Sequence, residues 1–453
     1  MERLIDKYMD FISSNKTERR CTSAGIELAE KYGYKNIDTV DSLKPGDKVY
    51  YNKMGKSLIL FNIGKDDISK GMNILGAHID SPRLDAKQSP IYEDKTYKTG
   101  IVYLNTHYYG GIKKYQWVAQ QLAIYGVVVK TDGTVVDVTI GDDPNDPVFC
   151  ISDILPHCAQ EQMKKTAAEF IEGEKLDAIL ACYPNVKNYQ DPEKDKYEPG
   201  DGKDKVLKFF EDKYGIKEED FASAELEIVP AGKARYLGFD KTLILGYGQD
   251  DRVCAYTSLV AMVEGEASGR TNCCILADKE ETGSAGATGM NSHLLDNAVA
   301  EVVARLDLRT NPELAIRRVL ANSYMLSSDV NTAFDPLNAN LYDSANSSFL
   351  GRGVVFNKYT GSRGKYGASD ANPEFIAKIR KQLYANDVYF QNAELAKVDV
   401  GGGGTIAKYA AEYGMDVLDC GVSVLSMHAP WEITSSYDVE QAYKCYKAFL
   451  ELE

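Results

Sequence analysis

The chain has 453 residues, of which 44% are hydrophobic and 26% charged, and its formal net charge is −15 at pH 7. Its length and composition are typical of a soluble globular protein with two domains. The negative charge argues against a nucleic-acid partner, and the lack of a long apolar run argues against a membrane partner. The nine scattered cysteines favour reduced thiols in a cytoplasmic protein.

The first 95 residues alternate between helix and strand patterns. They predict a helix near 1–31 and strands at 47–52, 57–63 and 73–78. From 96 to 232 the chain is richer in β-branched and aromatic residues, and Asp132-Gly133 is a favoured hairpin turn. The polar stretch at 188–205 predicts an exposed loop. We therefore expect a β-rich insert at 96–232.

Residues 233–453 return to alternating strands and helices. The predicted elements are strands at 242–246, 272–277, 300–306, 322–327 and 417–425, and helices at 252–264 and 437–451. This alternation is typical of a mostly parallel sheet covered by helices. The chain is therefore expected to form an α/β domain from 1–95 and 233–453, interrupted by the β-rich insert.

Acidic and histidine side chains follow the predicted strands of the α/β domain. His78 ends one strand and Asp80 lies two residues further on, where strand alternation gives both side chains the same direction. A carboxylate beside an imidazole fixes the tautomer that a metal-bound histidine requires. The other candidates at strand ends are Asp250, Asp251, Glu280, Glu281, Asp329 and His428.

These side chains are expected at one edge of the sheet, because ligands of open α/β sheets collect at the carboxyl ends of the strands. Two imidazoles and three carboxylates can hold two divalent metal ions, one carboxylate bridging both. Nitrogen and oxygen donors favour Zn²⁺ and also accept Co²⁺ or Mn²⁺. Asp307 competes with Asp329 as one of the metal-binding acids.

Five segments occur in a specific order along the chain: GAHIDSP, GQDDR, DKEETGS, SSDV and SVLSMHAP. In this order they resemble the aspartyl aminopeptidase and aminopeptidase I family of dinuclear zinc metallopeptidases. The resemblance covers most of the chain, including the insert. It implies a zinc-exopeptidase-like mixed sheet flanked by helices, with a dimerisation domain in the insert.

The resemblance also implies a role for each matching residue. His78 and Asp329 would bind one metal ion, Glu281 and His428 would bind the other, and Asp250 would bridge both. Asp251 is then expected to orient a neighbouring group.

Two further carboxylates have implied roles in the reaction. Glu280 would be the general base and Asp80 the carboxylate behind His78. Two metal ions about 3.5–4 Å apart can share and activate a water, and the free α-amine of a peptide can bind one of them. The expected function is removal of the N-terminal residue from short peptides. A dinuclear deacylase or carboxypeptidase-like hydrolase, and a non-catalytic shell-forming relative, are the alternatives.

Assembly and substrate preference are further expectations. The resemblance implies dimers built through the insert and a dodecameric shell made from them. It also implies that residues 401–404 form a wall of the substrate cleft, with a tight turn as the alternative, and that His157 reaches a neighbouring active site, with a buried structural role as the alternative. The basic residues Lys358, Arg363 and Lys365 either receive an acidic substrate side chain or form a solvated loop or subunit contact.

Overall fold

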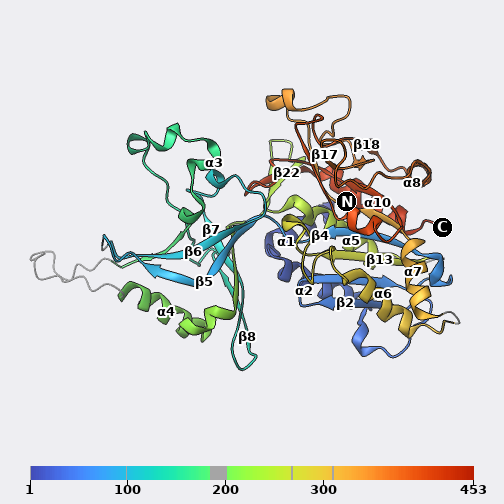
Figure 1. Cartoon of the computed structure of the whole chain (residues 1–453), viewed down its shortest axis with the longest axis horizontal. Coiled ribbons are helices and arrows are strands. Elements are labelled where there is room, and N and C mark those ends of the chain that lie inside the picture. Colours follow the sequence, from blue (N-terminus) through green and yellow to red (C-terminus); the bar gives the residue numbers. More distant parts are fainter. Residues whose placement is uncertain (1, 98, 184–200, 267–268, 309–310) are drawn as a thin grey trace, which may run out of the picture. The chain divides into compact units, whose positions relative to one another are not determined.

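The computed structural model describes residues 2–97, 99–183, 201–266, 269–308 and 311–453 (Figure 1). The chain divides into two compact units. The first unit comprises Met1–Ser81, Lys233–Met427 and Trp431–Glu453, and the second comprises Pro82–Gly232 and His428–Pro430. Within the described ranges, no helix combines the length and the apolar character that a membrane crossing requires.

The first unit is built on a nine-stranded mixed sheet. Its strands, in spatial order, are β1 (Lys35–Asn36), β2 (Lys48–Lys53), β3 (Ser57–Asn62), β13 (Thr271–Ala277), β4 (Met72–His78), β14 (Tyr324–Ser327), β20 (Asp416–Gly421), β16 (Val354–Asn357) and β18 (Phe390–Asn392). The neighbours β13, β4, β14 and β20 run parallel, so their carboxyl ends meet at one edge. The expected α/β class with a mixed sheet is confirmed.

Helices cover both faces of this sheet, because alternate side chains of each strand point to opposite faces. Leu58 and Leu60 of β3 belong to one hydrophobic core, and Ile59 and Phe61 belong to the other. The first core also contains α1 (Glu2–Ser14), α2 (Glu18–Lys31), α5 (Gln249–Glu264), α8 (Pro373–Ala385) and α10 (Ser436–Leu450). The second core contains α6 (Leu294–Arg305), α7 (Pro312–Ala321) and α9 (Ala407–Ala411).

Two predictions about local structure are corrected here. The predicted strand at 300–306 is wrong, because most of this segment forms the second half of α6. The buried residues Leu295, Val299 and Val302 recur every three or four positions, which is the helical period. The predicted helix near 1–31 is two helices, and the Thr17 side chain caps the second by accepting from the N–H of Arg20.

Two smaller sheets complete the first unit. One contains, in order, β11 (Arg235–Leu237), β12 (Leu243–Gly246), β22 (Glu432–Ser435), β21 (Ser423–Leu425) and β15 (Asn331–Thr332). The other pairs β17 (Gly361–Ser362) with β19 (Gly402–Gly403). Gly402 has φ of +131°, and a Cβ there would lie 2.2 Å from the carbonyl oxygen of Gly361, so this close pairing requires glycine.

The second unit contains a six-stranded antiparallel sheet and the helices α3 (Ala167–Phe170) and α4 (Asp201–Tyr214). The strand order is β8 (Val135–Ile140), β7 (Leu122–Val129), β10 (Ala224–Pro230), β5 (Arg83–Glu93), β6 (Ile101–Tyr109) and β9 (Ala178–Cys182). The predicted hairpin is confirmed by the pairing of β7 with β8.

Two boundaries in the second unit differ from the expected ones. Strand β5 belongs to this unit, because it pairs with β6 and β10, although residues up to 95 were expected in the α/β domain. Of the predicted loop at 188–205, residues 188–200 lie outside the described part of the chain. Residues 201–205 begin α4 instead of continuing a loop.

Candidate metal centre

His78 lies at the centre of a buried group of carboxylates. It is the last residue of β4 and is 1% exposed. Its Nδ1 lies 3.0 Å from the main-chain oxygen and 3.3 Å from Oδ1 of Asp80. Its Nε2 lies 3.1 Å from Oδ1 of Asp250, and 3.9 Å from both Oε2 of Glu280 and Oδ1 of Asp329. One ring nitrogen therefore contacts Asp80, and the other faces three carboxylates.

The carboxylates come from segments that follow different strands. Asp250 and Asp251 lie in the first turn of α5, after β12, and both have non-helical backbone angles. Glu280 and Glu281 lie in a 3₁₀ turn after β13. Asp329 follows β14. The parallel strands β13, β4 and β14 thus deliver acids and an imidazole to one edge, as the sheet topology predicts.

Asp80 connects the imidazole to the glutamate turn. Its Oδ1 accepts from the N–H of Glu280 at 3.1 Å, and its Oδ2 accepts from the N–H of Glu281 at 3.2 Å. Asp80 is 1% exposed, so these hydrogen bonds are shielded from water. It therefore fixes the Glu280–Glu281 main chain relative to His78.

The donor atoms form two groups that are compact enough for a metal ion. Atoms of His78, Asp250 and Glu281 lie within 4.8 Å of one another, as do atoms of His78, Asp251 and Asp329. Asp251 also accepts from the main-chain N–H of His78 at 3.4 Å, and its expected role of orienting a neighbour stays a prediction.

The electrostatics of this group favour a bound cation. Burial raises the pKa of Asp251 and of Asp329 well above the usual value for an aspartate, although the charge of His78 acts in the opposite direction. Burial alone lowers the pKa of His78, but hydrogen bonds with Asp250 and Asp80 raise it well above its usual value. Buried carboxylates need a counter-charge, and an imidazole with carboxylate oxygens is a donor set that Zn²⁺ accepts. The residues present therefore fit a divalent metal centre.

His428 has different surroundings. It follows β21 and is grouped with the second compact unit, where its Nδ1 lies 2.9 Å from the carbonyl oxygen of Gly111. A Cβ at Gly111 would lie 3.2 Å from Nδ1 of His428, so glycine leaves room for the ring. His428 is in neither donor group of the described residues. Its role as a ligand stays a prediction.

Two other candidate site residues, Asp307 and His157, are exposed to solvent. Asp307 is exposed and follows α6, and it is in neither donor group of the described side chains. His157 is exposed in a 3₁₀ turn, Pro156–Cys158, so the buried structural role considered for it is wrong. Whether His157 reaches a neighbouring active site stays a prediction.

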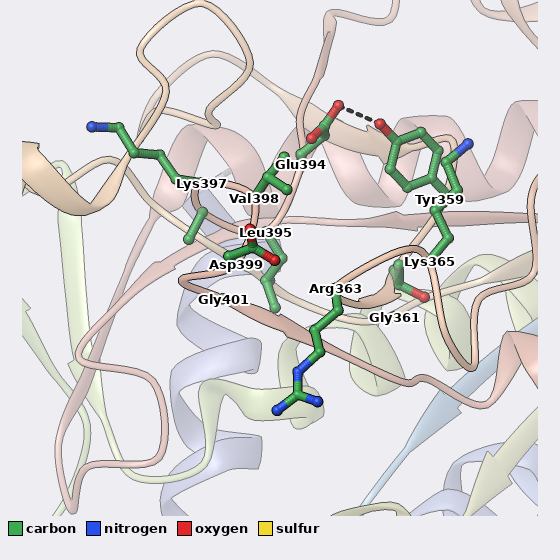
Figure 2. A pocket seen from close by; sticks show the side chains of 12 residues that line it. Tyr359, Gly361, Arg363, Lys365, Glu394, Leu395, Lys397, Val398, Asp399 and Gly401 are labelled. Carbon is green, nitrogen blue, oxygen red and sulfur yellow. Dashed lines mark hydrogen bonds between the residues drawn. The ribbon is translucent and has the colours of Figure 1, made fainter.

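A separate cavity of about 180 Å³ lies between the segments 359–365 and 394–401 (Figure 2). On one side the Tyr359 hydroxyl donates to Glu394 at 2.5 Å, and Figure 2 shows the Arg363 guanidinium pointing away from this pair. Gly401, one of the four glycines expected in the wall of the substrate cleft, lines the cavity.

Charges near this cavity are partly compensated. Lys358 and Lys365 lie 3.5 Å and 3.0 Å from the carboxylate of Asp370. Arg363 has no ion pair among the described residues, so it is the one basic side chain of the predicted loop still available to an anion. Glu394 also lines the cavity. Lys397 and Asp399 line it as well, so the cavity has three basic and two acidic side chains, and a preference for acidic substrates stays a prediction.

Comparison with known proteins identifies the family of this chain. A family model described as "Aminopeptidase I zinc metalloprotease (M18)" matches residues 11–450. A probable M18 family aminopeptidase 1 of Clostridium acetobutylicum is 54% identical over 451 residues, covering 99% of this chain and 94% of the relative.

Solved structures show the same fold. An M18 aminopeptidase crystal structure from Thermotoga maritima is 40% identical with a TM-score of 0.91, covering 100% of this chain and 96% of that one. The mApe1 dodecamer of S. cerevisiae is 22% identical with a TM-score of 0.75, covering 98% and 95%, and shows similarity of fold alone. The chain therefore belongs to the M18 family of zinc metalloproteases and is a metal-dependent aminopeptidase.

Proposed function

We propose that this aminopeptidase holds two divalent metal ions, preferably Zn²⁺, with His78, Asp250, Glu281, Asp329 and His428 as ligands and Asp250 between the ions. The observation that carries the proposal is the 4.8 Å grouping of donor atoms from His78, Asp250 and Glu281, with Asp329 Oδ1 3.9 Å from His78 Nε2. When bound, the ions supply a water of lowered pKa and polarise the scissile carbonyl.

Glu280 is the proposed general base. Its side chain is 17% exposed, so part of it is accessible to solvent, and its Oε2 lies 3.9 Å from Nε2 of His78. A carboxylate in this position can take the proton of the attacking water and pass it to the leaving amine. Asp80 supports this role, because it holds the main-chain N–H of Glu280 and contacts the ring of His78.

The proposed substrates are short peptides with a free N-terminus. The α-amine is the group that distinguishes an aminopeptidase substrate from the blocked substrates of a deacylase.

A matched pair of substrates tests this preference. Leucine p-nitroanilide should be hydrolysed with a kcat/KM at least about 100-fold higher than N-acetyl-leucine p-nitroanilide, since acetylation removes the amine contact, worth about 2.7 kcal/mol. Both substrates are assayed by nitroaniline absorbance at equal zinc concentration. Equal rates on the two would favour the deacylase-like alternative.

We also propose that twelve copies assemble through dimers formed by the second unit. The relative that supports this is the S. cerevisiae mApe1 dodecamer. The antiparallel sheet offers the edge strands β8 and β9, which are natural sites for association when another chain covers them.

The mass in solution tests the assembly. Light scattering of the intact protein should give about 600 kDa, which corresponds to twelve chains of 50.1 kDa. A species of about 50 kDa at working concentration would contradict the proposal.

A cytoplasmic location is proposed as well. All nine cysteines are free thiols, and all six in the first unit lie in strands or helices of its cores, where they pack as small apolar groups. Cell fractionation tests this location, and recovery of the protein outside the cell would contradict it.

A further inference from the structure

The main chain of Asp250 is held by side chains from distant parts of the first unit. Asp250 and Asp251 have non-helical backbone angles, so the helix cannot supply regular partners for their peptide groups. The N–H of Asp250 donates to Oε2 of Glu432 at 3.1 Å. Its carbonyl oxygen accepts from the Ser81 hydroxyl at 2.7 Å. Ser81 and Glu432 are 3% and 1% exposed.

A buried arginine holds the Ser81 hydroxyl in place. Arg252 is 0% exposed, and its Nη2 donates to Ser81 Oγ at 2.9 Å. Its Nη1 donates to the carbonyl oxygen of Asn15 at 2.8 Å, and its guanidinium lies 4.8 Å from the ring centre of Tyr247. Nε of Arg252 has no hydrogen-bond partner among the described residues. Because a buried guanidinium loses stability with each donor left unpaired, the two hydrogen bonds it does make restrict where it can lie.

Gly248 makes room for this guanidinium. It has φ of +72°, and a Cβ at this position would lie 1.7 Å from Nη2 and 2.3 Å from Cζ of Arg252. Any other residue at 248 would therefore displace the arginine and strain the main chain. The local geometry before α5 is thus built around the position of Arg252.

We propose that Ser81, Arg252 and Glu432 are positioning residues that fix the main chain of Asp250 and, through it, the direction of its carboxylate. The inference rests on the proposed function, in which that carboxylate lies between the two metal ions. Ser81 also lies three residues after His78 along the chain. Residues that orient metal ligands in this way typically change metal affinity about 10–100-fold.

Ser81→Ala tests the proposal directly. The substitution removes the donor to the Asp250 carbonyl and the acceptor of Arg252 Nη2 in one step. We expect zinc to dissociate about 10–100-fold more readily from the weaker site, measured by competition with a chromophoric chelator on the full-length protein. Ser81→Cys has a slightly larger side chain and a weaker donor, and should give a smaller loss in the same direction.

Ser258→Ala is the matched control. Ser258 lies on the same helix, α5, is 0% exposed, and its hydroxyl has no hydrogen-bond partner among the described residues. Its removal should leave zinc affinity unchanged. Thermal melting by circular dichroism reports folding, and Ser81→Cys decides the question if Ser81→Ala does not fold.

The outcomes distinguish a failure of the positioning role from a failure of the proposed metal ligands. If the wild-type chain binds two zinc ions and folded Ser81 variants bind them with wild-type affinity, the positioning role is overturned and the proposed function stands. If the wild-type chain binds no zinc, the proposed metal ligands are wrong, and the positioning role falls with them.

Discussion

Replacing Glu280 with glutamine is expected to lower kcat about 10²–10⁴-fold while both metal ions remain bound. Glutamine keeps the size and shape of the side chain but cannot accept the proton of the attacking water at neutral pH. The main-chain N–H of Glu280, which donates to Asp80, is untouched by the change, so the turn should keep its position. Steady-state hydrolysis of leucine p-nitroanilide gives kcat. Elemental mass spectrometry gives the number of metal ions bound per chain.

Glu266→Gln is the control for this experiment. Glu266 has an 82% exposed side chain and pairs with Lys48 at 3.2 Å on the surface. Such a pair contributes little to stability, so the control should retain full activity and metal content. Turnover by Glu280→Gln at the wild-type rate would remove Glu280 from the role of general base.

Replacing Asp250 with asparagine is expected to weaken the binding of both metal ions by at least about 100-fold and to abolish activity. Asp250 is 4% exposed, and its carboxylate lies 3.1 Å from Nε2 of His78. Asparagine retains one acceptor oxygen but removes the negative charge that a bridging ligand shares between two cations. Metal content after dialysis against a metal-free buffer measures the effect.

Asp307→Asn is the matched comparison, because Asp307 is the rival acid. It is exposed and follows α6, so this variant should keep both metal ions and its activity. Retention of two ions by Asp250→Asn would contradict the bridging role. Loss of metal from Asp307→Asn would show that the wrong acid was favoured.

Much of the candidate site was predictable because its residues follow strands. Three parallel neighbouring strands, β13, β4 and β14, end at or just before His78, Glu280, Glu281 and Asp329. Because the strands are parallel neighbours, their carboxyl ends lie at the same edge of the sheet. The fold class was predictable for the same reason, since the strand and helix periods alternate along the chain.

The positioning residues were not predictable in the same way. Ser81 and Arg252 are 171 positions apart, and Asp250 and Glu432 are 182 apart, so their hydrogen bonds depend on packing across the whole unit. Both Ser81 and Arg252 lie inside the segments that suggested the family, yet no local pattern assigns them a partner. The sequence gives no indication of a site role for Glu432 other than its position four residues after His428.

The strand predicted at 300–306 shows a different limit. Its apolar residues fit a short buried strand as well as a helix, and periodicity over seven residues does not separate the two. The preceding residues from Leu294 extend the same buried face, which becomes clear only when they are counted with it. The first domain boundary failed similarly, because the pairing of β5 depends on strands β6 and β10 further along the chain.

Anomalous diffraction at the zinc absorption edge, from crystals grown with zinc, tests the central claim most directly. Two peaks about 3.5–4 Å apart are expected on either side of the Asp250 carboxylate, with His78, Glu281, Asp329 and His428 as the other ligands. A map without density at this edge of the sheet, or with zinc bound only to other residues, would contradict the proposed metal centre.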